Sequence, residues 1–140
     1  MASFSKFNAF VEHLAEKVHN LGSDQLVVAL CAAANAPASG NSVLADLTQI
    51  SYTNLSSRNI TTSSSSQTSG TYKLVLADLT LTASGGSVGP FRYIVIYNDT
   101  PTSPADPLVG YYDYGSDLTL AAGESLTIDF DGTNGVLTLA

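Results

Sequence analysis

Two histidines are the side chains best suited to acid–base or metal chemistry, and the chain has no others. His13 and His19 are six residues apart, a spacing that places them on different sides of a helix. They form neither an HExxH motif nor an i, i+4 pair, so zinc is not an expected ligand. The stretch "GSDL" (115–118) is not a nucleophile elbow, and a Ser–His–Asp triad would need a histidine to leave its helix. We therefore expect no enzymatic activity and no cofactor.

Arg92 is one of only two arginines, and it lies in the apolar stretch "FRYIVIYN" (91–98). In a strand it shares a face with Ile94 and Ile96, so this face is covered over most of its length. Arg92 lies at the beginning of the strand, where its guanidinium can reach solvent or a carboxylate such as Asp113. A catalytic arginine would need a nucleophile or a base beside it. A structural ion pair is the favoured interpretation.

The stretch "DFDGTNG" (129–135) contains oxygen ligands that could suit calcium. Asp129, Asp131 and Asn134 could present them, but the twelve-residue EF-hand pattern and its closing glutamate are missing. Asp-Gly followed by Asn-Gly between two apolar runs is first a hairpin signal. A hairpin is favoured here, and ion binding by Asp129 and Asp131 stays open.

One amphipathic helix is expected at the N-terminus, within residues 1–22. Its apolar residues recur at steps of three and four, namely Phe4, Phe7, Val11, Leu14, Val18 and Leu21. Ser3 suits an N-cap, and Gly22 stands where a left-handed C-cap belongs. Phe10 widens the apolar face, which must pack against the chain's own sheet or against a neighbouring subunit.

Residues 25–140 are expected to form a β-rich body. The predicted strands are 25–34, 42–52, 71–83, 91–98, 108–115, 117–121, 124–130 and 135–140. The Ser- and Thr-rich stretch 53–70 is predicted as a surface loop or a sheet edge. Short strands at close spacing after one helix predict a mainly β fold, an antiparallel β-sandwich or jelly-roll-like domain. At this length a single domain covers 1–140.

The charge balance excludes several classes of partner. Five basic residues against twelve acidic ones give a net charge of −7. Such a chain repels a phosphate backbone and has no polybasic patch, so neither nucleic acid nor a membrane is an expected partner. Cys31 is the only cysteine, which excludes a disulfide framework. The N-terminal stretch lacks the continuous apolar region of a signal peptide, so we expect synthesis in a cytoplasm.

Aromatic and proline residues are the candidates for an interface. Adjacent Tyr111 and Tyr112 cannot both face one core, so one of them must point outward or into a neighbouring chain. The loop "DTPTSPADP" (99–107) is rigid and non-helical because it carries three prolines. The predicted interface residues are Phe4, Phe7, Phe10, Pro101, Pro104, Tyr111 and Tyr112.

Three stretches carry a resemblance to known proteins. They are "FNAFVEHLAEKVHNLGSDQLVVAL", "SQTSGTYKLVLADLTLTASGGSVGPFRYIVIYNDT" and "DYGSDLTLAAGESLTIDFDGTNGVLTLA". Their layout resembles that of small virion structural proteins of tailed bacteriophages. The resemblance implies a β-rich domain that assembles as a symmetric oligomer on the particle. Where an intact "NG" turn is expected, near 53–60, this chain has "YTNLSSRNI".

The functional hypothesis is a capsid decoration (cement) protein. It would bind junctions between major capsid protein subunits on the capsid exterior, preferably as a homotrimer, with avidity from many repeated contacts. Net negative charge suits the outside of a capsid better than its DNA-facing interior. Two alternatives are open: a tail or adhesion component of the virion, and a carbohydrate-binding module that uses exposed tyrosines.

Overall fold

Two apolar stretches of the sequence pair to form the centre of one sheet. They are β2 (Leu26–Cys31) and β6 (Val88–Asn98), which run antiparallel. β7 (Leu108–Leu120) pairs with the other side of β6, and the two-residue strand β1 (Ser5–Lys6) completes the order β1-β7-β6-β2. A computed structural model describes residues 2–140.

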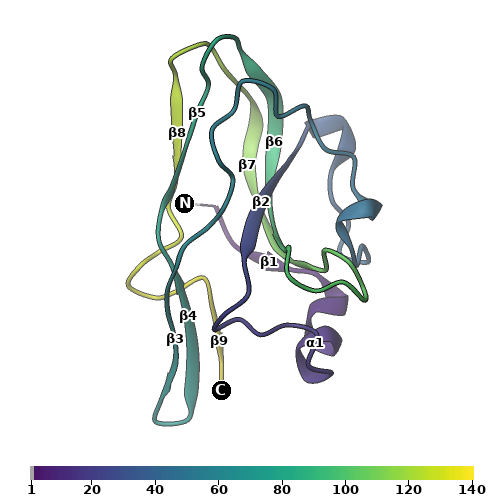
Figure 1. Ribbon diagram of the computed structural model, residues 1–140, viewed down its shortest axis with the longest axis vertical. Coiled ribbons are helices and arrows are strands. Elements are labelled where there is room, and N and C mark those ends of the chain that lie inside the picture. Colours follow the sequence, from purple (N-terminus) through teal and green to yellow (C-terminus); the bar gives the residue numbers. More distant parts are fainter. Residues whose placement is uncertain (1) are drawn as a thin grey trace.

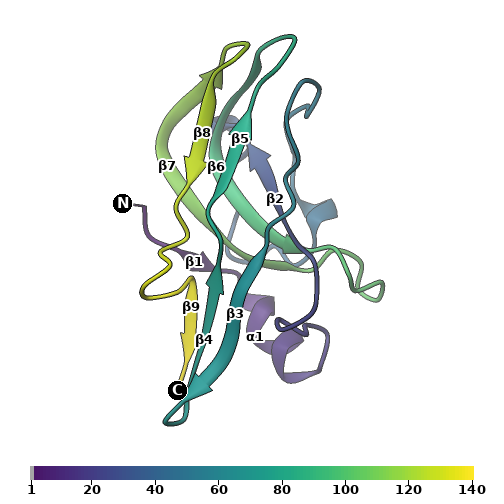
Figure 2. The same cartoon turned by 60° about the vertical axis from the view of Figure 1, so that its left-hand side comes forward.

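A second layer of strands packs against this first sheet (Figure 1). One part has the order β3-β4-β9, with β3 (Thr62–Thr68), β4 (Thr71–Leu76) and β9 (Leu137–Leu139). The other part pairs β5 (Leu79–Thr82) with β8 (Ser125–Ile128). β4 continues into β5 in the same direction, so the two parts lie end to end (Figure 2). The predicted antiparallel β-sandwich with one N-terminal helix is confirmed.

The prediction of a hairpin at 129–135 is wrong. β8 pairs with β5, whereas β9 pairs with β4, and both pairs are antiparallel. Because β4 and β5 run in the same direction, β8 and β9 must also share one direction. The intervening loop therefore bulges out of the sheet and returns to it without reversing the chain (Figure 2).

Other strand predictions also need correction. The stretch 42–52 is not a strand, and it contains the short 3-10 helix η2 (Leu44–Asp46). The predicted strands 108–115 and 117–121 are one strand, β7, which continues through Gly115 at a φ of 100°. The predicted strand 71–83 is interrupted at residues 77–78, which separate β4 from β5. The serine-rich stretch 53–70 contains β3, an edge strand, as one of the two sequence alternatives allows.

The helix α1 (Asn8–Ala15) is much shorter than the predicted segment. Neither Ser3 nor Gly22 caps it. The helix ends in a Schellman motif, in which Val18 N donates to His13 O at 2.9 Å and Lys17 N donates to Leu14 O at 3.4 Å. Lys17 occupies the left-handed position, with a φ of 69°. The chain then turns away from the helix axis at Lys17, five residues before Gly22, the C-cap that the sequence predicts.

The N-terminal arm crosses β7 at very close range. Lys6 of β1 lies opposite Gly110, and the ring of Phe4 lies over the same glycine. A Cβ atom added to Gly110 would stand 2.8 Å from the carbonyl oxygen of Ser5 and would collide with the Phe4 ring. Gly110 therefore lets the arm pack onto the sheet.

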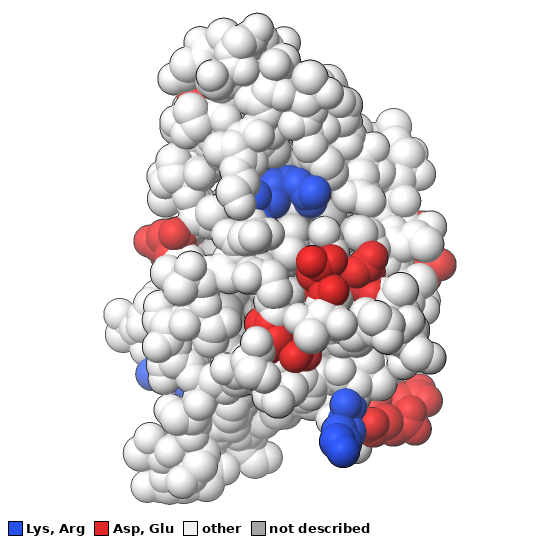
Figure 3. Space-filling model, viewed as in Figure 1, with Lys and Arg blue, Asp and Glu red and all other residues white. Residues whose placement is uncertain are grey.

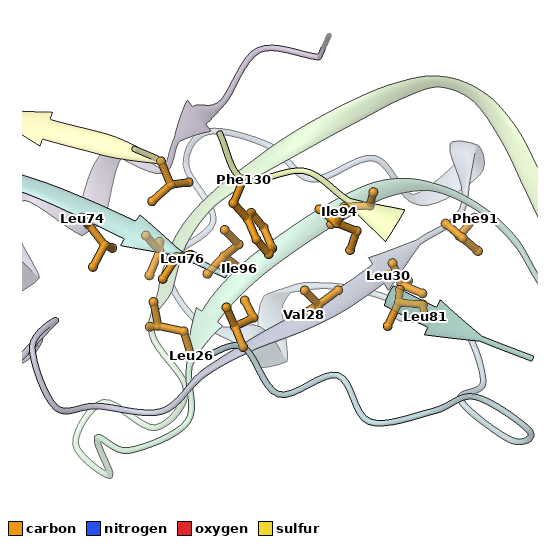
Figure 4. Packing of buried hydrophobic residues seen from close by; sticks show 14 of the residues in the cluster. Leu26, Val28, Leu30, Leu74, Leu76, Leu81, Phe91, Ile94, Ile96 and Phe130 are labelled. Carbon is orange, nitrogen blue, oxygen red and sulfur yellow. The ribbon is translucent and has the colours of Figure 1, made fainter. Parts of the chain in front are cut away.

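The main core lies between the two layers (Figure 4). One face of the β2–β6 pair supplies alternate residues such as Leu30 and Ile96, and the second layer supplies Leu74, Leu81 and others. This alternation is the expected consequence of strand geometry. Phe130, from the loop after β8, is also fully buried in this core.

A second, smaller core covers the opposite face of the first sheet. It contains the other alternate residues of the β2–β6 pair, including Val27, Ala29 and Val95. Phe7 is fully buried there, and Leu44 of η2 packs against the cluster. The first sheet is thus covered on both faces.

The segment 50–61 joins the two layers along one side of the sandwich. Val28 N donates to Arg58 O at 2.9 Å and Ile60 N donates to Leu26 O at 2.9 Å, so this segment extends the edge of β2. Ser56 N donates to Thr82 O at 3.0 Å, which ties the same segment to β5. This side of the sandwich is therefore closed by backbone hydrogen bonds.

Replacing Lys17 with glycine should stabilise the protein. The left-handed conformation costs a residue with a Cβ atom about 1–2 kcal/mol, and glycine avoids that cost but loses more chain entropy on folding. We expect Lys17→Gly to raise the free energy of unfolding by about 0.5–1 kcal/mol in urea denaturation. Lys17→Ala is the matched control, because it removes the same charge and keeps the strain. Equal stability of the two variants would contradict the helix end described above.

Replacing Gly110 with alanine should destabilise the protein. The added methyl group must displace the Phe4 ring or the Ser5 backbone, and overpacking of this kind costs about 1–3 kcal/mol. Urea denaturation measures the loss. Gly40→Ala is the control, since a Cβ atom at Gly40 meets no atom within 4 Å. A loss no larger for Gly110→Ala than for Gly40→Ala would show that the arm does not pack as described.

Candidate functional site: an open apolar seam

Arg92 forms the structural ion pair that the sequence predicts. Its Nε donates to Asp113 Oδ1 at 2.8 Å and its terminal nitrogen donates to Oδ2 at 3.1 Å, which is bidentate geometry. These hydrogen bonds, followed by one from Gly115 N, lower the pKa of Asp113. The pair lies at the surface of the β6–β7 ladder, so it fixes side-chain positions there and contributes little to stability.

The carboxylates of the 129–135 loop are occupied by the loop itself. Asp131 Oδ1 accepts from Asn134 N at 3.0 Å and Oδ2 accepts from Asn134 Nδ2 at 2.8 Å, contacts that lower the pKa of Asp131. Asp129 Oδ1 accepts from the backbone of Asp131 at 2.8 Å. Within residues 2–140, no three His, Cys, Asp or Glu side chains gather as metal ligands.

One motif escaped the sequence analysis. Residues 85–89, "GGSVG", match the GxSxG pattern of a nucleophile elbow. In the structure, residues 85–87 lie in the turn between β5 and β6, and Val88 and Gly89 begin β6. A nucleophile elbow is followed by a helix, whereas a strand follows here. Both histidines lie in other elements, in α1 and in the segment directly after it. The match therefore does not create a hydrolase site.

The predicted interface residues lie in different environments. Phe7 and Phe10 are buried in the chain's own cores. Tyr111 packs against Phe7 with ring centroids 5.2 Å apart, and Tyr112 packs against Phe4 at 5.5 Å. The two tyrosines do face opposite sides of the sheet, but the chain itself covers much of both.

Most residues of the proline loop lie at least partly at the surface. Pro101 and Pro104 are half-buried. Asp99 and Asp106 lie close together in the same loop, and burial followed by the charge of Asp99 raises the pKa of Asp106. On the face drawn in Figure 3, carboxylates gather near the middle while most of the surface is uncharged. A contact surface at the proline loop therefore stays a prediction.

The side opposite the 50–61 segment is open, and we call this opening the seam. It separates the edge of the first sheet, formed by β1 and β7, from the edge of the second layer, formed by β8 and β9. β1 pairs only with β7, β8 only with β5, and β9 only with β4, so strand edges face the seam without a partner strand among residues 2–140. Figure 2 shows these edges on the side of the N-terminus.

Two hollows follow the seam. One, of about 140 Å³, has a lining that includes Ile94, Tyr112, Tyr114 and Ile128. The other, of about 360 Å³, is lined by Phe4, Lys6, Phe10, Val11 and residues 136–139. Burial and the carboxylates of Asp129 and Asp131 raise the pKa of Tyr112 to about 12, so its hydroxyl stays neutral. Apolar side chains dominate both linings.

The most exposed large apolar side chains are concentrated at the seam. Within residues 2–140 they are Val11, Tyr114 and Leu139, exposed by 47%, 47% and 44%. Each of them lines one of the two hollows. Leu139 also lines a third hollow of about 390 Å³, which lies beside the end of α1. Exposed apolar groups gathered beside free strand edges are suited to binding another polypeptide.

Some of the residues at the seam were already selected from the sequence. Phe4, Phe10 and Tyr112, which were predicted as contacts, do line the seam, although Phe10 is buried. Leu139 was missed, because a C-terminal leucine in an alternating strand looks like a core residue. In the structure β9 is an edge strand and Leu139 is 44% exposed.

Comparison with known proteins places the chain in no family. No protein family, no curated protein and no solved structure matches it. Among the described residues, no helix has the length and apolar character needed to cross a membrane.

Proposed function

We propose that this protein is a structural component of a tailed-phage virion, most specifically a decoration protein that binds junctions between capsid subunits. The observation that carries the proposal is the seam, where the exposed apolar residues Val11, Tyr114 and Leu139 flank unpaired strand edges.

The partner at the seam would be an extended segment of a capsid subunit. A strand added beside β9 would satisfy its free backbone groups and insert alternate side chains into the hollows. β9 has only three residues, so each contact would be weak. Repetition of that contact around a symmetric oligomer, preferably a trimer, would supply the avidity that a single short strand lacks.

The surface supports a position on the outside of the particle. Charged residues make up 12% of the chain and the net charge is −7. Packaged DNA would repel such a surface, whereas the capsid exterior does not present a phosphate backbone. The net negative charge also limits unwanted association between particles.

Co-sedimentation with DNA-filled heads tests the proposal. The wild-type protein should bind in a number close to the copy number of the capsid subunits. Leu139→Asp and Val11→Asp should each reduce head occupancy at least tenfold, because a charge would enter an apolar contact, while leaving the fold intact. Thr48→Asp adds the same charge at an exposed position outside the linings of the seam, so it should bind normally.

Three results would count against the proposal. Binding by Leu139→Asp and Val11→Asp at the wild-type level would remove the seam from the interface. Failure of the wild-type protein to bind heads would refute decoration altogether. Occupancy of only a few copies per particle would indicate a tail or adhesion component instead.

Carbohydrate binding is the second candidate function. It rests on Tyr114, the only aromatic residue among the most exposed large side chains of residues 2–140. A tyrosine ring of this kind can stack on a sugar. Glycan-array binding by the isolated protein, lost in Tyr114→Ala and retained in Leu139→Asp, would favour this function over decoration.

A further inference from the structure

The two histidines come together in the folded chain. The helix ends at Ala15, and the turn after it brings His19 back toward His13, so their ring centroids are 6.1 Å apart. This corrects the expectation that the two rings lie on different sides of a helix. His19 is buried, and its ring packs on Phe10 at 5.1 Å.

Asn98, at the end of β6, determines which nitrogen of His19 carries the proton. The Asn98 carbonyl oxygen accepts from Thr100 N at 3.1 Å, so the amide nitrogen is left to donate elsewhere. It donates to Asp24 Oδ2 at 2.7 Å and to His19 Nδ1 at 3.0 Å. His19 Nδ1 is therefore an acceptor, and the neutral ring carries its proton on Nε2.

The remaining buried nitrogens of the pair are complementary. His19 Nε2 is a buried donor without an acceptor, and His13 Nδ1 is a buried atom without a partner. In its Nε2-protonated tautomer, His13 presents a lone pair at Nδ1. The ring centroids are 6.1 Å apart, and each of the two nitrogens carries the cost of a buried polar atom without a hydrogen bond.

We propose that His13 and His19 form an acid-sensitive latch, which holds the end of α1 against the end of β6 at neutral pH and releases it in acid. Protonation of His19 would require a hydrogen on Nδ1, directly facing the N–H donors of Asn98. That event removes an acceptor from a buried site.

The environment of His19 is consistent with release of the latch in acid. Burial and then the charge of His13 lower the pKa of His19 to about 4, while the carboxylate of Asp24 acts in the opposite sense. Lys17 and Tyr72 line the adjacent hollow and add no negative charge there. Because the folded pKa lies below the unfolded value of about 6.5, the stabilisation is complete above pH 6.5 and is lost as the pH falls through about 4.

A metal site is the alternative use of two such nitrogens. A metal bound to His19 Nε2 would require the proton to move to Nδ1, where ligating histidines normally donate to a carboxylate or carbonyl. Here Nδ1 faces the N–H of Asn98 instead. The hydrogen-bond network therefore favours the proton latch over metal binding.

The latch controls apolar surface close to the seam. Phe10 lines one seam hollow, and Leu14, His19 and Leu21 line the hollow beside Leu139. Release of the α1 end would open both hollows. The latch consists only of residues of this chain, so its test does not depend on whether the protein binds capsids.

Hydrogen exchange of backbone amides at pH 7, 5.5 and 4, corrected for intrinsic rates, tests the latch. In the wild-type protein, amides at 16–24 should lose protection by up to about 10²-fold between pH 6.5 and 4, whereas β2 and β6 stay protected. His19→Asn keeps an acceptor oxygen for Asn98 and cannot be protonated, so its protection at 16–24 should not change with pH. A parallel loss in both proteins would overturn the latch.

Nitrogen NMR of the imidazole rings in the wild-type protein provides a second, independent measurement that needs no variant. The Nε2-protonated tautomer of His19 and a titration midpoint well below 6.5 are expected. His13→Asn removes the neighbouring positive charge and should raise that midpoint. The Nδ1-protonated tautomer, an ordinary midpoint, or a rise in melting temperature on adding Zn²⁺ that both His13→Asn and His19→Asn abolish would each overturn the proposal.

Discussion

The double burial of the β2–β6 pair is the constraint on which the rest of the structure depends. Every residue of β2 is buried, so successive side chains must enter two different apolar layers. One layer is the second set of strands, which packs on Leu30 and Ile96. The other is built from Phe7 and η2, which cover Val95 and its neighbours. A two-layer sandwich alone would leave half of this strand pair exposed to water.

The segments that flank and cover the first sheet also explain why the seam is open. Segment 50–61 reaches from the edge of β2 to β5 and closes one side with backbone hydrogen bonds. On the other side, the cover is the N-terminal arm, which can approach β7 closely because Gly110 has no side chain. That arm contributes a strand of only two residues, which pairs with β7 and not with β8 or β9. The sandwich is consequently open along one side, with apolar residues at its rim.

The end of α1 shows how a local backbone event changes the chemistry available to the molecule. The left-handed residue Lys17 stops the helix and sends the chain back across its own last turn. As a result, His19 enters the apolar environment beside Phe10 and contacts Asn98, a residue far away in the sequence. Burial then favours the neutral ring, so that protonation of His19 is coupled to the packing around it.

The sequence by itself determined the properties that depend on near neighbours. The nearly continuous apolar run in 91–98 predicted a strand covered on both faces, and Arg92 within it predicted an ion pair with a carboxylate such as Asp113. The tertiary structure decided which strands pair, where the helix ends and which side of the sandwich stays open. The turn residues of 129–135 suit a hairpin equally well, yet β8 and β9 join different partners because β4 and β5 already run end to end. Strand pairing depends on the combined contacts of strands that lie far apart in the sequence, and no local sequence pattern encodes those contacts.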